Sequence, residues 1–235
     1  MKIKYIFLII FIFSINNKFA FSQFDYSLYG FVKTDVIYDT RQNVTAREGH
    51  LLLYPTNVLD AQGEDANDGL NFNILSIQSR AGIKISAPEF LGAKSSGLIE
   101  GEFFGSNNSI SGAMRMRHAY LKLQWNNHEV LAGQTWNPIF IDDCYPLTVS
   151  FNTGIPFVQF SRNPMIKYTY IPEKIRFHIS AIAERDYQSP GPDGESSNYL
   201  RNSGLPIFNF GTNYDDGTLY FAANVMYKEI QPRLM

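Results

Sequence analysis

The sequence is poor in the features that mark several common classes of protein. It has 235 residues but one cysteine, Cys144, which excludes an internal disulfide and fits a bacterial envelope protein better than a small secreted domain. After residue 22 it has no apolar run near the ~20 residues that a membrane-spanning helix needs. Its 20 basic and 22 acidic residues provide no basic surplus for nucleic acid. We therefore predict neither a helical membrane protein nor a nucleic-acid-binding protein.

Motifs for catalysis and for metal binding are also missing. The chain has no GxGxxG or GxxxxGK[ST] loop for a nucleotide and no GxSxG turn for a nucleophilic serine. Its four histidines, His50, His118, His128 and His178, lack the spacing of metal ligands. Nothing in the sequence positions a serine against His118 or His178, as a Ser-His hydrolase would require. We predict no enzymatic activity, no metal and no cofactor.

The N-terminus has the pattern of a secretory signal peptide. Lys2 and Lys4 form a charged region, and an apolar run from Tyr5 to Ile15 follows. A small-x-small sequence at residues 20–22 predicts cleavage before Gln23. We therefore divide the chain into a signal peptide, residues 1–22, and a mature segment, residues 23–235.

The mature segment is rich in aromatic residues and in alternating patterns. It has the β-structure signature of apolar residues at every second position, as in Tyr120–Gln124. The alternation from Tyr26 to Tyr38 covers thirteen residues, which is long for a soluble strand and enough to cross a bilayer at a tilt. With 19 Phe and 14 Tyr, the composition fits the aromatic girdles of a membrane barrel.

Nine strands are predicted, and the connections between them alternate in length. The strands are 26–38, 73–86, 98–105, two within 114–136, 165–171, 175–184, 207–214 and 218–230. The short turns are 87–96, where Pro88 ends a strand, then 126–128, 172–174 and 215–217, and the long loops are 40–70, 106–113, 137–164 and 185–206. This alternation is typical of an antiparallel up-and-down transmembrane β-barrel. Nine strands leave two unpaired edges, so we interpret the segment as the N-terminal part of a larger barrel whose C-terminal strands are missing.

The loop at 40–70 ends in several acidic residues, which offer oxygen atoms of the kind that Ca²⁺ prefers. They are Asp60, Glu64, Asp65 and Asp68. Their spacing is not that of an EF-hand, and we favour a solvated acidic loop.

The turn near residue 126 sets the register of the hairpin around it. A two-residue turn, Asn126-Asn127, would place Leu131 beside Lys122 on the polar face. A three-residue turn, 126–128, keeps Leu131 on the apolar face and places Gln134 on the polar face, so we choose it. Arg115 and Arg117 then have the wrong parity for the interior. They lie above the bilayer, or a β-bulge turns them inward, and the sequence does not decide between the two.

At these residues the chain resembles a known family. The segments RHAYLKLQW and EVLAGQTWNPIF, with IEGEFFG before them and NPMIKYTY and YKEIQPRL after them, resemble the DcaP-like trimeric outer-membrane porins. The resemblance spans most of residues 26–234. It implies a closed antiparallel barrel, a homotrimer in the bacterial outer membrane, and passive uptake of small, often anionic, solutes. It also implies that the loop after the GQTW strand folds inward and narrows the pore.

We accordingly predict a porin for small hydrophilic solutes, with anions favoured by the basic surplus on the strand faces. The expected pore-lining residues are Lys33, Asp35, Arg80, Lys84, Glu100, Glu102, Tyr120, Lys122, Gln134, Lys167 and Arg176. Asp142 and Asp143 are expected in the constriction loop, with Arg162 opposing them to create a transverse field. For each of these charges, the alternative is a salt bridge of the pore wall without a role toward solutes. Two other functions stay open: a plugged structural or adhesive barrel that binds partners through its long loops, and a secreted carbohydrate-binding β-sandwich.

Overall fold

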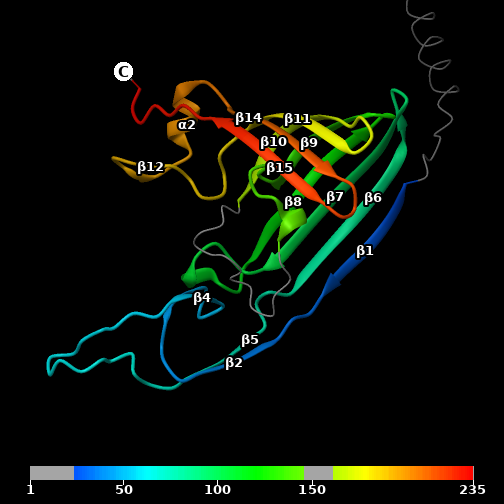
Figure 1. Ribbon diagram of the computed structural model, residues 1–235. Coiled ribbons are helices and arrows are strands. Elements are labelled where there is room, and N and C mark those ends of the chain that lie inside the picture. The colour runs from blue at the N-terminus through cyan, green and yellow to red at the C-terminus, as the bar shows by residue number, and fades with distance from the viewer. Residues whose placement is uncertain (1–23, 146–160, 235) are drawn as a thin grey trace, which may run out of the picture.

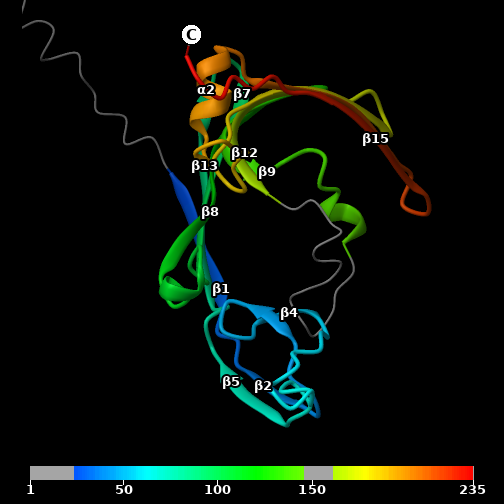
Figure 2. The ribbon, with the colours of Figure 1, turned by 90° about the vertical axis from the view of Figure 1, so that its left-hand side faces the viewer.

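A nine-stranded antiparallel sheet dominates the structure, a computed structural model that describes residues 24–145 and 161–234. Its strands follow the spatial order β1-β6-β7-β8-β9-β10-β11-β14-β15. Their bounds are β1 Asp25–Phe31, β6 Arg80–Phe90, β7 Ala93–Phe103, β8 Met114–Gln124, β9 His128–Trp136, β10 Arg162–Tyr170, β11 Ile175–Ile182, β14 Ile207–Asp215 and β15 Tyr220–Tyr227. The sheet curves into an open trough and does not close on itself (Figures 1 and 2). The predicted partial barrel of nine strands is confirmed. The predicted signal peptide lies outside the described residues.

The alternating sequence gives the sheet two different faces. Ile83, Ile99 and Ala119 are cross-strand partners on the outer face. Large apolar side chains stay exposed there, including Leu28 and Leu121, at 77% and 51%. An uncovered apolar sheet face of this extent is unfavourable in water, whereas lipid accommodates it. The inner face carries most of the polar side chains.

The first hairpin extends beyond this sheet. β2, Asp35–Asp39, pairs with β5, Asn71–Leu75, and the loop between them contains a smaller pair, β3, Val44–Ala46, and β4, Leu51–Tyr54. The predicted strands 26–38 and 73–86 are therefore each divided in two, which corrects the prediction. The cause lies at the break, where the Lys33 amide donates to Ser79 Oγ (3.1 Å) and leaves the ladder.

The acidic loop is held by its own hydrogen bonds. Asp65 accepts from the amides of Val58 and Asn67 and pairs with Arg41, and these contacts, the Val58 amide first, lower the pKa of Asp65. Among the described residues no group of three His, Cys, Asp or Glu side chains is arranged to hold a metal ion.

The turn predicted at 87–96 is much tighter than expected. β6 continues through Pro88 to Phe90, and the chain reverses at Leu91 and Gly92, both with positive φ. The ladder shifts register between Ala87 and Phe90, so the missing amide of Pro88 falls at an irregularity. A proline in a sheet is tolerated at such a place, which is why it did not end the strand.

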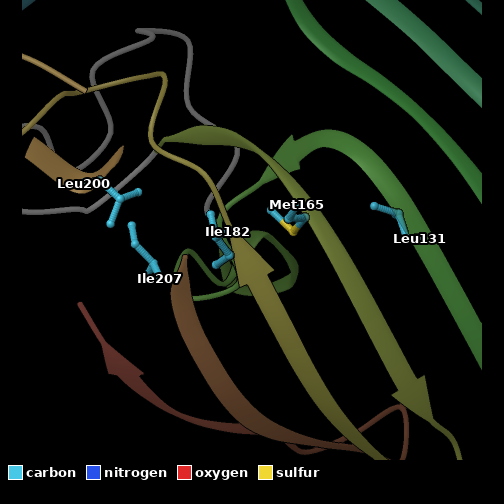
Figure 3. Packing of buried hydrophobic residues seen from close by; sticks show 5 residues of the cluster. All are labelled: Leu131, Met165, Ile182, Leu200 and Ile207. Carbon is cyan, nitrogen blue, oxygen red and sulfur yellow. The ribbon is translucent and has the colours of Figure 1, made fainter. Parts of the chain in front are cut away.

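One end of the inner face is covered by the segment between β11 and β14. This segment holds β12, Pro190–Gly191, β13, Gly194–Glu195, and a short helix, α2, Asn198–Ser203. Leu200 of α2 lies against a cluster on the sheet formed by Leu131, Met165, Ile182 and Ile207 (Figure 3). This cap buries a small apolar core at the rim. In the described part of the chain, no helix has the length and apolarity required to cross a membrane.

Candidate pore wall and constriction

The hairpin of β8 and β9 turns through two residues, Asn126 and Asn127. The Trp125 amide donates to the His128 carbonyl (2.9 Å), and Lys122 pairs with Leu131. The predicted three-residue turn is therefore wrong. Leu131 points inward because the small core at the rim accepts it, a tertiary contact that apolar parity along one hairpin does not reveal.

This register moves one predicted pore-lining residue to the other face. Gln134 pairs with Ala119 and Pro164 on the outer face. Its amide donates to the carbonyl oxygens of Met116 (3.2 Å) and Arg117 (3.4 Å). Gln134 thus satisfies backbone groups where the β8–β9 ladder stops, and it does not face the interior.

A β-bulge in β8 settles the orientation of the two arginines that the sequence left open. The pairing of β7 with β8 shifts after Glu100, so Glu100 opposes His118 while Glu102 opposes Arg115. The extra residue, Arg117, points inward like Arg115. Of the two alternatives, a position above the bilayer or a β-bulge that turns the arginines inward, the structure shows the β-bulge.

Both arginines enter a buried ion cluster on the inner face. Glu102 is fully enclosed and accepts from Arg115 Nη2 (2.6 Å), Arg117 Nη1 (3.0 Å) and Arg80 Nη2 (3.2 Å). Glu100 accepts from Arg117 Nε (2.6 Å) and from the Tyr29 hydroxyl (2.6 Å). Such dense pairing fixes the side chains, so this part of the wall is rigid and its glutamates are not free for solutes.

Arg162 belongs to the same cluster. Its Nη1 lies 3.9 Å from Glu102 Oε1, its Nη2 lies 3.8 Å from Asp186 Oδ2, and its guanidinium stacks 4.7 Å from the Trp136 ring centre. The side chain is 3% exposed. Arg162 therefore does not oppose the loop acids as predicted. It instead joins the two ends of the loop, since Trp136 precedes the loop and Arg162 follows it.

The first part of that loop, residues 137–145, turns back over the inner face. Phe140 is buried against Trp136, with ring centres 4.6 Å apart. The Asn137 amide donates to the Ser161 carbonyl (2.9 Å) and ties the ends of the loop together. The short helical turn η2, Asp142–Cys144, lies within the trough of the sheet (Figure 2). The predicted inward fold holds for these residues; the rest of the predicted loop, up to residue 160, lies outside the described ones.

A recess of about 470 Å³ lies between this loop and the wall. From the wall it is lined by Tyr120, Lys122, Glu129, Lys167 and Arg176, and from the loop by Asp142 and Asp143 among others. Lys122 Nζ lies 3.4 Å from Glu129 Oε2. Desolvation, and then the neighbouring Asp143 carboxylate, raise the pKa of Asp142.

A family model described as DcaP outer membrane protein matches residues 14–205. The chain belongs to this family. It is accordingly a protein of the bacterial outer membrane. None of the curated proteins matches the chain significantly.

Two solved structures resemble this member of the DcaP family in fold. One is the outer membrane channel DcaP of Acinetobacter baumannii, with 24% identity and a TM-score of 0.64, covering 87% of this chain and 53% of that one. The other is an anion-selective porin from Comamonas acidovorans, with 16% identity and a TM-score of 0.51, covering 88% of this chain and 58% of that one. The chain thus spans a little over half the length of each structure.

The remaining predicted residues of this DcaP-family wall fall into two groups. Lys33 donates to Asp35 Oδ2 (2.8 Å) and Gln78 Oε1 (2.7 Å) at the neck of the extension, away from the recess. Lys84 lies over the ring of Tyr29 on the inner face of the main sheet. Several residues that line the recess were not predicted from the sequence, namely Glu129, Thr169, His178, Asn213 and Tyr220. The two-residue turn would have identified Glu129, because it places Glu129 beside Gln124 on the inner face.

Proposed function

We propose that the chain forms a wall and the constriction of a passive porin for small hydrophilic solutes that carry an anionic group. The observation that carries the proposal is the recess between wall and loop, where Lys167 and Arg176 make no hydrogen bond or ion pair with any described residue. Unpaired cations at a narrow point of a channel attract anionic groups. The proposal assigns no catalysis to the chain.

The proposed pore wall follows the inner face of the sheet. It comprises Arg80, Lys84, Glu100, Glu102, Tyr120, Lys122, Lys167 and Arg176, with Asp142 and Asp143 on the constriction loop. In this proposal the ion cluster makes the neighbouring part of the wall rigid, and Lys167 and Arg176 bind the anionic group of the solute. We further propose that three such barrels assemble, with the apolar outer face of the sheet against lipid or a neighbouring copy.

Conductance of the protein purified from the outer membrane tests the proposal in planar bilayers. We expect discrete steps and, in a KCl gradient, a reversal potential on the anion side. The double variant Lys167→Met and Arg176→Met should lower the anion preference about two- to fivefold. This is the size expected for charge interactions that solvent screens. The matched control, Lys94→Met with Lys174→Met, removes two exposed charges outside the recess and should leave the selectivity unchanged. Absence of any conductance step would instead favour a plugged barrel.

A further inference from the structure

The recess has charges of both signs on its two sides. The wall contributes Lys122, Lys167 and Arg176, and the loop contributes Asp142 and Asp143. Glu129 of the wall pairs with Lys122, so the two side chains largely neutralise one another. What remains is two cations on the wall and two carboxylates on the loop. The recess is close to neutral in sum but polarised across its width.

The loop side is held in place relative to the wall. The Asn213 amide donates to the Tyr220 hydroxyl (2.7 Å), which in turn is hydrogen-bonded to Asp143. The Asp142 carboxylate accepts hydrogen bonds from the backbone amides of Asp142 and Asp143. Among the described residues it makes no hydrogen bond or ion pair with another side chain, so it keeps acceptor capacity for a solute.

Such an arrangement treats different solutes differently. A simple anion is attracted by the wall and repelled by the loop, so the loop carboxylates weaken its attraction without removing it. A solute with an acidic group at one end and an ammonium group at the other satisfies both sides, with the acid at Lys167 and Arg176 and the ammonium at Asp142. A guanidinium group forms bidentate hydrogen bonds with oxyanions, which would orient the acidic end of the solute.

We infer that the recess selects zwitterionic solutes, small molecules that carry a carboxylate or sulfonate and an ammonium group a few bonds apart. The inference rests on the proposed porin function and narrows its solutes. The volume of about 470 Å³ suits a small organic molecule. The balanced charges argue against net charge alone as the basis of selectivity at this point of the channel.

Taurine, isethionate and ethanolamine provide a matched set of probes. Taurine and isethionate share a sulfonate and differ only in an ammonium or a hydroxyl group; ethanolamine has the ammonium without the sulfonate. We expect proteoliposomes of the protein purified from the outer membrane to admit taurine about two- to fivefold faster than isethionate at neutral pH. The double variant Asp142→Asn and Asp143→Asn should abolish this preference while isethionate enters at least as fast as before. The control, Asp25→Asn with Asp68→Asn, removes two exposed carboxylates elsewhere and should retain it.

The outcomes separate the inference from the proposed function. Normal conductance with equal entry of taurine and isethionate would overturn the inference alone. A taurine preference that persists in the Asp142/Asp143 variant would do the same. Absence of both conductance and entry of all three probes would overturn the porin proposal and the inference together.

Discussion

Glu102 is the charged side chain on which the buried ion cluster depends. It has no exposed surface and receives hydrogen bonds from Arg80, Arg115 and Arg117. Removing its charge leaves several arginines near one another without their common partner. Breaking a buried ion pair in this way costs about 3–5 kcal/mol. We expect Glu102→Gln to lower the free energy of unfolding by an amount in that range, measured by denaturant titration in detergent.

The matched control for this change is Glu89→Gln, since Glu89 is exposed and makes no side-chain hydrogen bond or ion pair with a described residue. It should alter the unfolding free energy by less than about 0.5 kcal/mol. Equal stability of the two variants would show that the cluster does not stabilise the wall.

Asp142 predicts a pH dependence of selectivity. Its raised pKa means that this carboxyl takes up a proton at a higher pH than an ordinary aspartate. As the pH falls through that value, the loop loses one negative charge while the Lys167 and Arg176 cations remain. Anion preference in a KCl gradient should therefore rise on acidification, starting above the pH at which exposed carboxylates titrate. Asp142→Asn should show high anion preference already at neutral pH and a flatter profile; an unchanged profile would contradict the assignment.

At the scale of the element, the β8–β9 hairpin makes a test of register possible. The two-residue turn directs Glu129 inward and Ala132 outward, and a three-residue turn would reverse both. In a Cys144→Ser background, which removes the exposed native thiol, Glu129→Cys should react with a membrane-impermeant thiol reagent. Ala132→Cys should react at least about tenfold more slowly, because lipid excludes both the reagent and the thiolate. The opposite order would restore the three-residue turn.

This hairpin also shows what local sequence can and cannot predict. Period-two alternation correctly placed Tyr120 and Lys122 on the inner face, because the polar and apolar faces of a barrel wall differ along each strand. Leu131 broke the alternation, and one hairpin does not reveal that Leu131 joins a cluster with Met165 and Ile182 of the following strands. The parity of Arg115 and Arg117 indicated either a β-bulge or a position above the bilayer. It did not decide between them, because the contacts of Arg117 with Glu100 and Glu102 that favour the bulge come from the neighbouring strand.

The predictions for Arg162 and for an unbroken strand through Lys33 were wrong for a related reason. Distance along the chain suggested that Arg162, at the end of the loop, faces the acids Asp142 and Asp143. Its actual partners, Glu102 and Asp186, come from sequence positions far to either side. The break depends on one side chain, Ser79 Oγ, replacing a ladder partner. Long-range polar contacts of this kind leave no periodic signal in the sequence.

At the scale of the whole molecule, strand number decides what the sheet is able to form. In an antiparallel sheet of nine strands, the first and the last, β1 and β15, run in the same direction. Joining these two edges directly would require a parallel ladder, and two copies related by an axis along the barrel would have two such seams. An odd number of additional strands closes the barrel with antiparallel pairs throughout.

The open edges predict the behaviour of residues 23–235 expressed alone. β1 and β15 each present one side of their backbone without a partner in the sheet. In the hydrocarbon region each unsatisfied backbone group costs several kcal/mol, which no apolar outer face offsets. Refolded into planar bilayers, this segment should therefore give no discrete conductance steps, whereas the protein purified from the outer membrane should give them under the same conditions. A stable step of defined size from residues 23–235 would mean that the edges find partners in another copy, and the requirement for additional antiparallel strands would then be wrong.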